Sequence, residues 1–227
     1  MTRNKKKSAG ENAAGDAAAA EQMVRTFRIG AHEIGARPLT PGLYLVSTPI
    51  GNLGDMTIRG LETLAGADII ACEDTRVSRV LLDRYGIATR PYAYHEHNAE
   101  RVGPKLMEAL EGGQGVALIS DAGTPLVSDP GYRLSQTAIE AGLPVIPVPG
   151  ASAPMAALVA SGLPSDAFLF AGFLPSKDKA RRDRLATFAT TEATLMFFES
   201  PNRLAASLNS ASDVLGAERP AAVCREL

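Results

Sequence analysis

The residues best suited to chemistry lie in one loop that follows an apolar, strand-like segment. Residues 116–119 read VALI, and residues 120–131 continue as SDAGTPLVSDPG. In an open parallel α/β sheet the binding crevice lies outside the carboxyl ends of the strands, so we expect this loop to bind a ligand. The alternative is an ordinary strand-to-helix connection in which Asp and Ser only cap a helix. The predicted contact residues are Ser120, Asp121, Ala122, Gly123, Thr124 and Pro125.

A second loop of this kind spans residues 48–55 and reads TPIGNLGD. Gly51 and Gly54 suit a close approach of the backbone to a ligand. The spacing is not that of a dinucleotide fingerprint, and the chain contains no P-loop motif. Glu73 and Asp74 end the next strand-like run about twenty residues on, where a Rossmann-type site holds a ribose hydroxyl. These features predict a nucleoside-containing ligand other than NAD.

Short apolar strands alternate with amphipathic helices from residue 42 onward, which indicates crossover units over a mainly parallel sheet. A third sharp turn, PVPGAS at 147–152, follows a strand and places Ser152 as a helix N-cap. The predicted strands of this domain, assigned to residues 41–161, are 43–47, 68–72, 90–94, 116–120 and 145–148. Three ligand loops are therefore expected at one edge of the sheet.

Composition fits a globular α/β protein without selecting a function. The 227 residues are 45% hydrophobic and 21% charged, and the net charge is −2. No apolar run reaches the roughly eighteen residues of a membrane span, and the N-terminus lacks the apolar core of a signal peptide. Cys72 and Cys224 are interpreted as reduced thiols of a cytoplasmic protein. His95 and His97 have no third ligand nearby, so no metal site is expected.

Five cations crowd into residues 177–184 and form a candidate RNA contact, although a solvated helix face is the equal alternative. A second basic run, Lys5 to Lys7, lies in residues 1–40, whose composition predicts a disordered extension. Residues 162–166 look like a linker. A second α/β domain is expected over 166–227, with strands at 168–172 and 194–198 and a last strand at 221–227 that ends without support.

Several motifs together carry a resemblance. They are TPIGNLGD at 48–55, CEDTR at 72–76, HEHN at 95–98, SDAGTPLVSDPGY at 120–132, PGAS at 149–152, GLPSD at 162–166, GFLPSKDKARRD at 172–183 and FFESPNR at 197–203. In this order the chain resembles the bacterial small-subunit rRNA cytidine 2′-O-ribose methyltransferases of the tetrapyrrole methylase superfamily. Tetrapyrrole-modifying relatives usually carry G-x-G-P-G-D in the first loop. The departure from that pattern at residues 49–55 favours the rRNA branch.

The resemblance implies two α/β domains with S-adenosylmethionine bound between them, a homodimer, and methyl transfer to 16S rRNA or the small ribosomal subunit. It also implies that the second domain is incomplete at its C-terminus. The expected cofactor contacts are Pro49, Gly51, Leu53, Gly54, Asp55, Ser120, Asp121, Ala122, Gly123, Thr124, Pro125, Pro149, Gly150, Ala151, Phe170 and Phe198. The expected RNA contacts are Arg76, Lys177, Lys179, Arg181, Arg182 and Arg184.

Methyl transfer from a sulfonium is an in-line displacement, which depends on positioning in a water-poor cleft and on a proton acceptor for the hydroxyl. The candidates for that acceptor are Glu73, Asp74, His95 and Asp121, and the sequence does not rank them. Each has a structural alternative, such as capping a helix or holding the cofactor. Two other functions stay open: a tetrapyrrole methyltransferase, and a nucleotide-binding module without catalysis.

Overall fold

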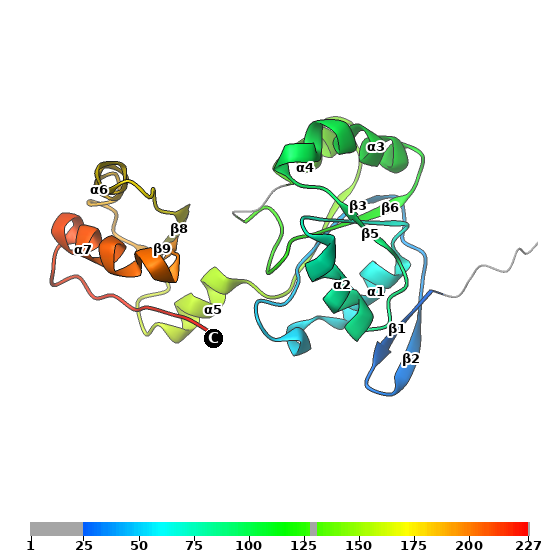
Figure 1. Cartoon of the computed structure of the whole chain (residues 1–227), viewed down its shortest axis with the longest axis horizontal. Coiled ribbons are helices and arrows are strands. Elements are labelled where there is room, and N and C mark those ends of the chain that lie inside the picture. The colour runs from blue at the N-terminus through cyan, green and yellow to red at the C-terminus, as the bar shows by residue number, and fades with distance from the viewer. Residues whose placement is uncertain (1–24, 128–130, 227) are drawn as a thin grey trace, which may run out of the picture.

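The computed structural model describes residues 25–127 and 131–226. The larger unit contains a five-stranded sheet with helices on both faces, and a smaller unit contains two strands and three helices (Figure 1). No helix within the described residues is long and apolar enough to cross a membrane.

The sheet of the larger unit is parallel throughout, with strand order β5-β4-β6-β3-β7. Every strand therefore ends at the same edge, as the sequence predicted for the ligand loops. The predicted strands are confirmed to within one or two residues. Their observed bounds are β3 Gly42–Val46, β4 Ile69–Cys72, β5 Pro91–Ala93, β6 Gly115–Ile119 and β7 Val145–Val148.

Successive side chains of the central strands point to opposite faces of the sheet and so contribute to two hydrophobic cores. In β6 the side chains of Ala117 and Ile119 join one core, whereas Val116 and Leu118 join the other. Helices α1 (Ile58–Gly66) and α2 (Thr75–Arg84) close the first core. Helices α3 (Ala99–Glu111) and α4 (Tyr132–Glu140) close the second on the opposite face (Figure 1). Burial on both faces explains why β3 and β6 are almost wholly apolar.

A hairpin of β1 (Arg25–Ile29) and β2 (His32–Ala36) precedes the sheet and packs on α1. Phe27 is 1% exposed in the first core, and the Arg25 guanidinium lies 2.7 Å from the Asp68 carboxylate. The prediction of a disordered extension over residues 1–40 is therefore wrong for residues 25–40, because Phe27 supplies a core contact. Residues 1–24, including Lys5 to Lys7, lie outside the described residues.

The smaller unit holds the parallel pair β8 (Phe168–Phe173) and β9 (Thr194–Phe198), as predicted, with α6 (Asp178–Ala186) and α7 (Leu204–Leu215) beside them. Helix α5 (Ala153–Ala160) contacts β9 (Figure 1). The chain thus crosses between the units at residues 149–152, ahead of the predicted linker at 162–166.

The predicted last strand at 221–227 is wrong for the described residues 221–226, which form no strand. This segment passes beside α5 instead of pairing with β8 or β9. The Sγ atom of Cys224 lies 3.8 Å from the carbonyl oxygen of Ala157 in that helix.

Candidate functional site

Two of the predicted ligand loops are tied together directly. The amides of Thr48 and Gly123 each donate to the other's carbonyl oxygen, at 2.9 and 3.0 Å, and form an isolated antiparallel bridge. The Thr48 hydroxyl also donates to the carbonyl oxygen of Ser120 at 3.2 Å. The loops after β3 and β6 therefore form one rigid platform at the edge of the sheet.

The Thr124 hydroxyl attaches the third loop to this platform. Ser47 Oγ donates to Thr124 Oγ1 at 3.1 Å, and Thr124 Oγ1 donates to the carbonyl oxygen of Ala151 at 3.1 Å. Gly150 permits the approach, because a Cβ atom there would lie 2.9 Å from the Cβ of Ser47. Hydrogen bonds between hydroxyls and backbone thus fix the three loops relative to one another.

Gly123 has a φ of +83°, in the left-handed region that favours glycine. A Cβ atom at this position would lie 3.3 Å from Cγ2 of Ile50. The backbone conformation therefore favours glycine, and a side chain here would also crowd Ile50.

A cavity of about 260 Å³ opens beside the platform, with walls from both units. The larger unit contributes Ala122, Gly123 and Thr124, and the smaller contributes the rings of Phe173 and Phe198. The complete lining is Ile50, Ala122, Gly123, Thr124, Val127, Ser152, Ala153, Pro154, Phe173 and Phe198. An apolar cavity with a few convergent hydroxyls and backbone groups is typical of a small-molecule site.

A larger cavity, of about 1160 Å³, lies between α5, β8, β9, α7 and residues 217–226. Its lining is mainly apolar and comes almost wholly from the smaller unit. It shares Ile50, Ala153, Pro154 and Phe198 with the smaller cavity, but none of the residues 120–124 line it. The position of the smaller cavity at the carboxyl ends of parallel strands makes it the candidate site, despite its volume.

The predicted cofactor residues divide into four groups. Ala122, Gly123, Thr124 and Phe198 line the smaller cavity, whereas Pro149, Gly150 and Ala151 lie in the crossover that leads to it. Phe170 lines the larger cavity and packs against Phe198 with the ring centroids 4.8 Å apart. The other predicted residues, Pro49, Gly51, Leu53, Gly54, Asp55, Ser120, Asp121 and Pro125, are not part of its lining.

The end of the first loop is committed to the fold of the larger unit. Residues Leu53–Asp55 form a 3-10 turn, and Leu53 packs against the first core. The Tyr85 hydroxyl donates to the carbonyl oxygen of Leu53 at 2.5 Å. Leu53, predicted to contact the cofactor, therefore lies against α2 instead.

Sequence reasoning missed several residues of the lining. Ile50 and Val127 lie within the loops at 48–55 and 120–131, and Ser152, Ala153 and Pro154 lie at the end of the turn at 147–152 or directly after it. Taking every residue of each loop and the start of the next helix would have included them. Phe173 was missed because the pairing of β8 with β9 shifts register between Phe170 and Phe173. This irregularity brings the rings of both Phe170 and Phe173 against Phe198. In a regular strand, two side chains that are three residues apart would point to opposite faces of the sheet.

Asp74 is engaged by Arg76. Its carboxylate accepts from the Arg76 amide at 2.8 Å and from the guanidinium at 2.6 Å, and these bonds lower the pKa of Asp74 to about 2. The Asp74 amide donates to Oδ1 of Asp121 at 3.0 Å. Asp74 caps α2, as its structural alternative predicted, while Asp121 joins the ends of β4 and β6.

Glu73 and His95 lie at the same edge. Burial, followed by the charge of Asp121, raises the pKa of the Glu73 carboxyl, and His95 acts in the opposite direction. Nδ1 of His95 is buried without a hydrogen-bond partner among the described residues. The His95 and His97 rings lie 6.0 Å apart, and the described residues contain no cluster of three metal-ligand side chains.

The basic helix α6 differs from its prediction. The Arg181 side chain is 5% exposed, and its guanidinium donates to Ser210 Oγ, the Ser176 carbonyl oxygen and Asp178. Arg181 is therefore removed from the predicted RNA contacts, because packing against α7 buries it. Arg182 pairs with Asp178 and with Asp213.

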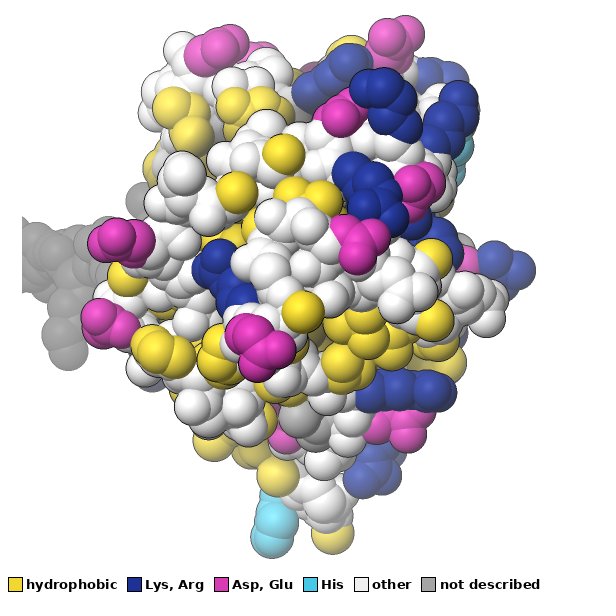
Figure 2. All heavy atoms as spheres, turned by 90° about the vertical axis from the view of Figure 1, so that its left-hand side faces the viewer, with side chains coloured by type: hydrophobic (Ala, Val, Ile, Leu, Met, Phe, Trp, Pro, Cys, Tyr) yellow, Lys and Arg dark blue, Asp and Glu magenta, His cyan; other side chains and the backbone are white. Residues whose placement is uncertain are grey.

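The remaining cations lie at the surface. Lys179 pairs with Asp183 at 2.7 Å, and Arg184 lies over the Phe188 ring at 4.6 Å. Figure 2 shows Lys and Arg side chains gathered along one side of the face that the smaller unit presents, with Asp and Glu between them. The surface is thus a mixed-charge strip and not a purely basic patch.

The chain is similar to a known family and to several named proteins. The family model described as tetrapyrrole (corrin/porphyrin) methylases matches residues 42–227. Proteins named ribosomal RNA small subunit methyltransferase I are 69% identical over 88% of this chain in Mesorhizobium japonicum, and 51% identical over 82% of it in Vibrio cholerae. The chain spans 68% and 65% of those two relatives, about two thirds of their length.

A solved cobalt precorrin-4 methyltransferase, a cobalamin biosynthetic enzyme, matches with a TM-score of 0.59 at 18% identity, over 78% of this chain and 76% of that one. This likeness concerns the fold alone. The chain belongs to the tetrapyrrole methylase family, and within it to the group of relatives named ribosomal RNA small subunit methyltransferase I.

Proposed function

We propose that this protein transfers a methyl group from S-adenosylmethionine to the ribose 2′-hydroxyl of a cytidine in 16S rRNA. The observation that carries the proposal is the cavity at the strand-end platform, walled by Ala122 to Thr124 on one side and by Phe173 and Phe198 on the other. The names of the relatives support small-subunit rRNA as the substrate. The chain spans about two thirds of the length of those relatives, and the proposal concerns the activity of the whole protein.

The lining suits S-adenosylmethionine. A small residue at 122 and glycine at 123 leave room beside the backbone, the Ser152 hydroxyl suits a polar group, and the Phe rings suit an apolar or cationic surface. When bound, this cofactor supplies an electrophilic methyl group on a sulfonium that leaves as a neutral thioether. The ties among Ser47, Thr48 and Thr124 hold the site rigid, so little ordering is left to occur during the reaction.

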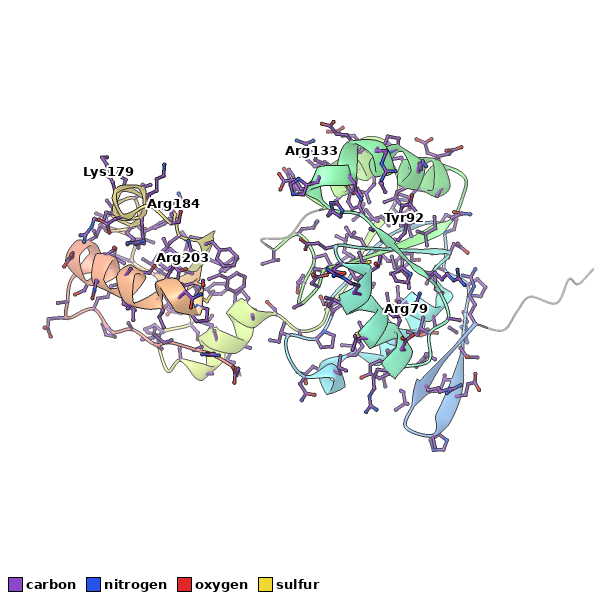
Figure 3. All side chains as sticks on the ribbon, viewed as in Figure 1. Arg79, Tyr92, Arg133, Lys179, Arg184 and Arg203 are labelled. Atoms are coloured by element: carbon purple, nitrogen blue, oxygen red, sulfur yellow. The ribbon has the colours of Figure 1, made fainter. Side chains whose placement is uncertain are left out.

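The proposed RNA contacts are surface cations on both units. Arg76 is 89% exposed at the start of α2, and it accompanies Lys177, Lys179, Arg182 and Arg184. Figure 3 shows Lys179 projecting outward from α6, and Arg133 at the end of α4 that is nearer to the smaller unit. Such cations bind phosphates and leave the reading of the bases to the cleft.

The same proposal includes a homodimer that works in the cytoplasm, where rRNA is found. Sedimentation of the full-length protein tests the dimer. A single monomeric species at micromolar concentration would contradict it.

Labelled methyl transfer to rRNA from cells that lack the modification tests the function. We expect incorporation into 16S rRNA and none into rRNA that already carries the methyl group. Turnover of a tetrapyrrole with no incorporation into RNA would assign the protein to the other branch of the family.

A further inference from the structure

We propose that Glu73 accepts the proton of the ribose 2′-hydroxyl, and that the ribose of the target nucleotide lies over the ends of β4 and β5. This inference rests on the proposed function. It assigns the acceptor side of the site, which neither the cavity lining nor the comparisons identify.

The order of the strands limits where the acceptor of the ribose proton can lie. In the part of the chain that the structure describes, the sheet continues beyond the platform only on the β6 side. The three platform loops follow β6, β3 and β7, which are neighbours in the sheet. Strands β4 and β5 continue the same edge on the β6 side, and neighbouring strands lie about 4.8 Å apart. Glu73 directly follows β4, and His95 comes two residues after β5. Both residues therefore flank the platform at the distance of one or two strands.

The carboxylates of Asp74 and Asp121, at the same edge of the sheet, already accept hydrogen bonds within the protein. Asp74 is held by Arg76, and a carboxylate with a pKa of about 2 is a weak base. Asp121 accepts the amide of Asp74 and so joins two loops. Within the described residues the Glu73 carboxylate takes part in no hydrogen bond or salt bridge, so its oxygens are free to meet a hydroxyl.

The surroundings of Glu73 make it a better base than an ordinary carboxylate. Its pKa is raised by partial burial and by the facing charges of Asp121 and Asp74, while His95 acts against them. General-base efficiency grows as the pKa of the base approaches the working pH. A carboxylate shifted in this direction binds a proton more tightly than an ordinary carboxylate does.

The step balances without a further reactant. The O2′–CH3 bond forms as the S–CH3 bond breaks, and the O2′ proton passes to the Glu73 carboxylate. The products are a ribose methyl ether, a neutral thioether and a carboxylic acid, which then releases its proton to solvent.

Single-turnover methyl transfer between pH 5 and 9 tests the assignment in the full-length protein, with Glu73→Gln against wild type. We expect Glu73→Gln to lose about 100- to 10,000-fold in rate, and its profile to lose the acidic limb that reports ionisation of the base. Cofactor and RNA dissociation constants should stay within about twofold. Glu96→Gln is the matched control, because Glu96 is exposed in the turn beside His95, and it should keep the rate and profile of wild type.

The Glu73→Asp variant distinguishes loss of the base from a loss of rate caused by a change in structure. It keeps a carboxylate that is one methylene shorter, so we expect a rate between those of wild type and Glu73→Gln, with the acidic limb retained. A Glu73→Gln protein with the wild-type rate and acidic limb would overturn the assignment. So would loss of that limb in His95→Asn alone, which would identify the imidazole as the base. Wild-type protein that methylates no ribose would instead contradict the proposed function itself.

Discussion

The platform of the larger unit and helix α6 of the smaller unit use polar residues in opposite ways. In the platform, backbone groups and the hydroxyls of Thr48 and Thr124 hold the loops together, while Ala122 and Gly123 line the cavity. In α6, the guanidinium groups of Arg181 and Arg182 donate hydrogen bonds to Asp178, Ser210 and other groups of the same unit. A dense run of charge therefore does not by itself indicate binding, because its side chains can pair with other groups of the same unit.

Removal of Arg181 should give the largest effect on stability. Arg181→Ala removes the buried guanidinium that donates to Ser210, Ser176 and Asp178 between α6 and α7, and we expect a loss of about 2–4 kcal/mol in the free energy of unfolding. Arg182→Ala is the matched control. Its side chain is 38% exposed, and it should cost less than about 1 kcal/mol. Urea denaturation measures both, and equal losses would mean that burial does not distinguish the two arginines.

Filling the cavity from the platform side should come next. Ala122→Leu adds bulk at an exposed position of the lining without disturbing the left-handed conformation of Gly123, so we expect S-adenosylmethionine to bind at least about tenfold more weakly, or about 1.4 kcal/mol. Ala141→Leu, at the exposed end of α4 and outside the lining, is the control. Calorimetric titration that shows unchanged binding in Ala122→Leu would place the cofactor elsewhere.

Replacing surface cations should have a smaller, salt-dependent effect. Lys177→Ala with Arg184→Ala removes two cations that are not committed to salt bridges within the described residues, and should flatten the slope of log K against log salt by roughly 1.4 for single-stranded RNA. Lys179→Ala should change the slope less, because Lys179 already pairs with Asp183. An unchanged slope in the double variant would make α6 an ordinary solvated face.

The smallest expected effect concerns pH. The folded pKa of Asp74 is about 2, below its usual value of 3.8, so the ionised form favours folding above about pH 4. That contribution is lost as the pH falls through about 2. Asp74→Asn should therefore remove a small part of the acid dependence of the thermal midpoint between pH 4 and 2. A dependence identical to that of wild type would contradict the pairing with Arg76.

Sequence patterns predicted the seven strands that position the site, because short apolar runs bounded by turn residues are local signals. The hairpin at 25–36 was missed because a single residue, Phe27, carries its burial among charged neighbours. The role of Arg181 depends on Ser210, which is 29 residues away, and charge clustering does not encode that contact. The position of Phe173 depends on the irregular pairing of β8 and β9, which a regular strand pattern does not predict.

Methyl transfer to a matched pair of RNA substrates, one with cytidine and one with 2′-deoxycytidine at the target, tests the central claim most directly. The full-length protein should methylate the cytidine substrate and leave the deoxy substrate unmodified, although the neighbouring nucleotides still support binding of both. Incorporation of label into the deoxy substrate would contradict ribose chemistry at the strand-end site.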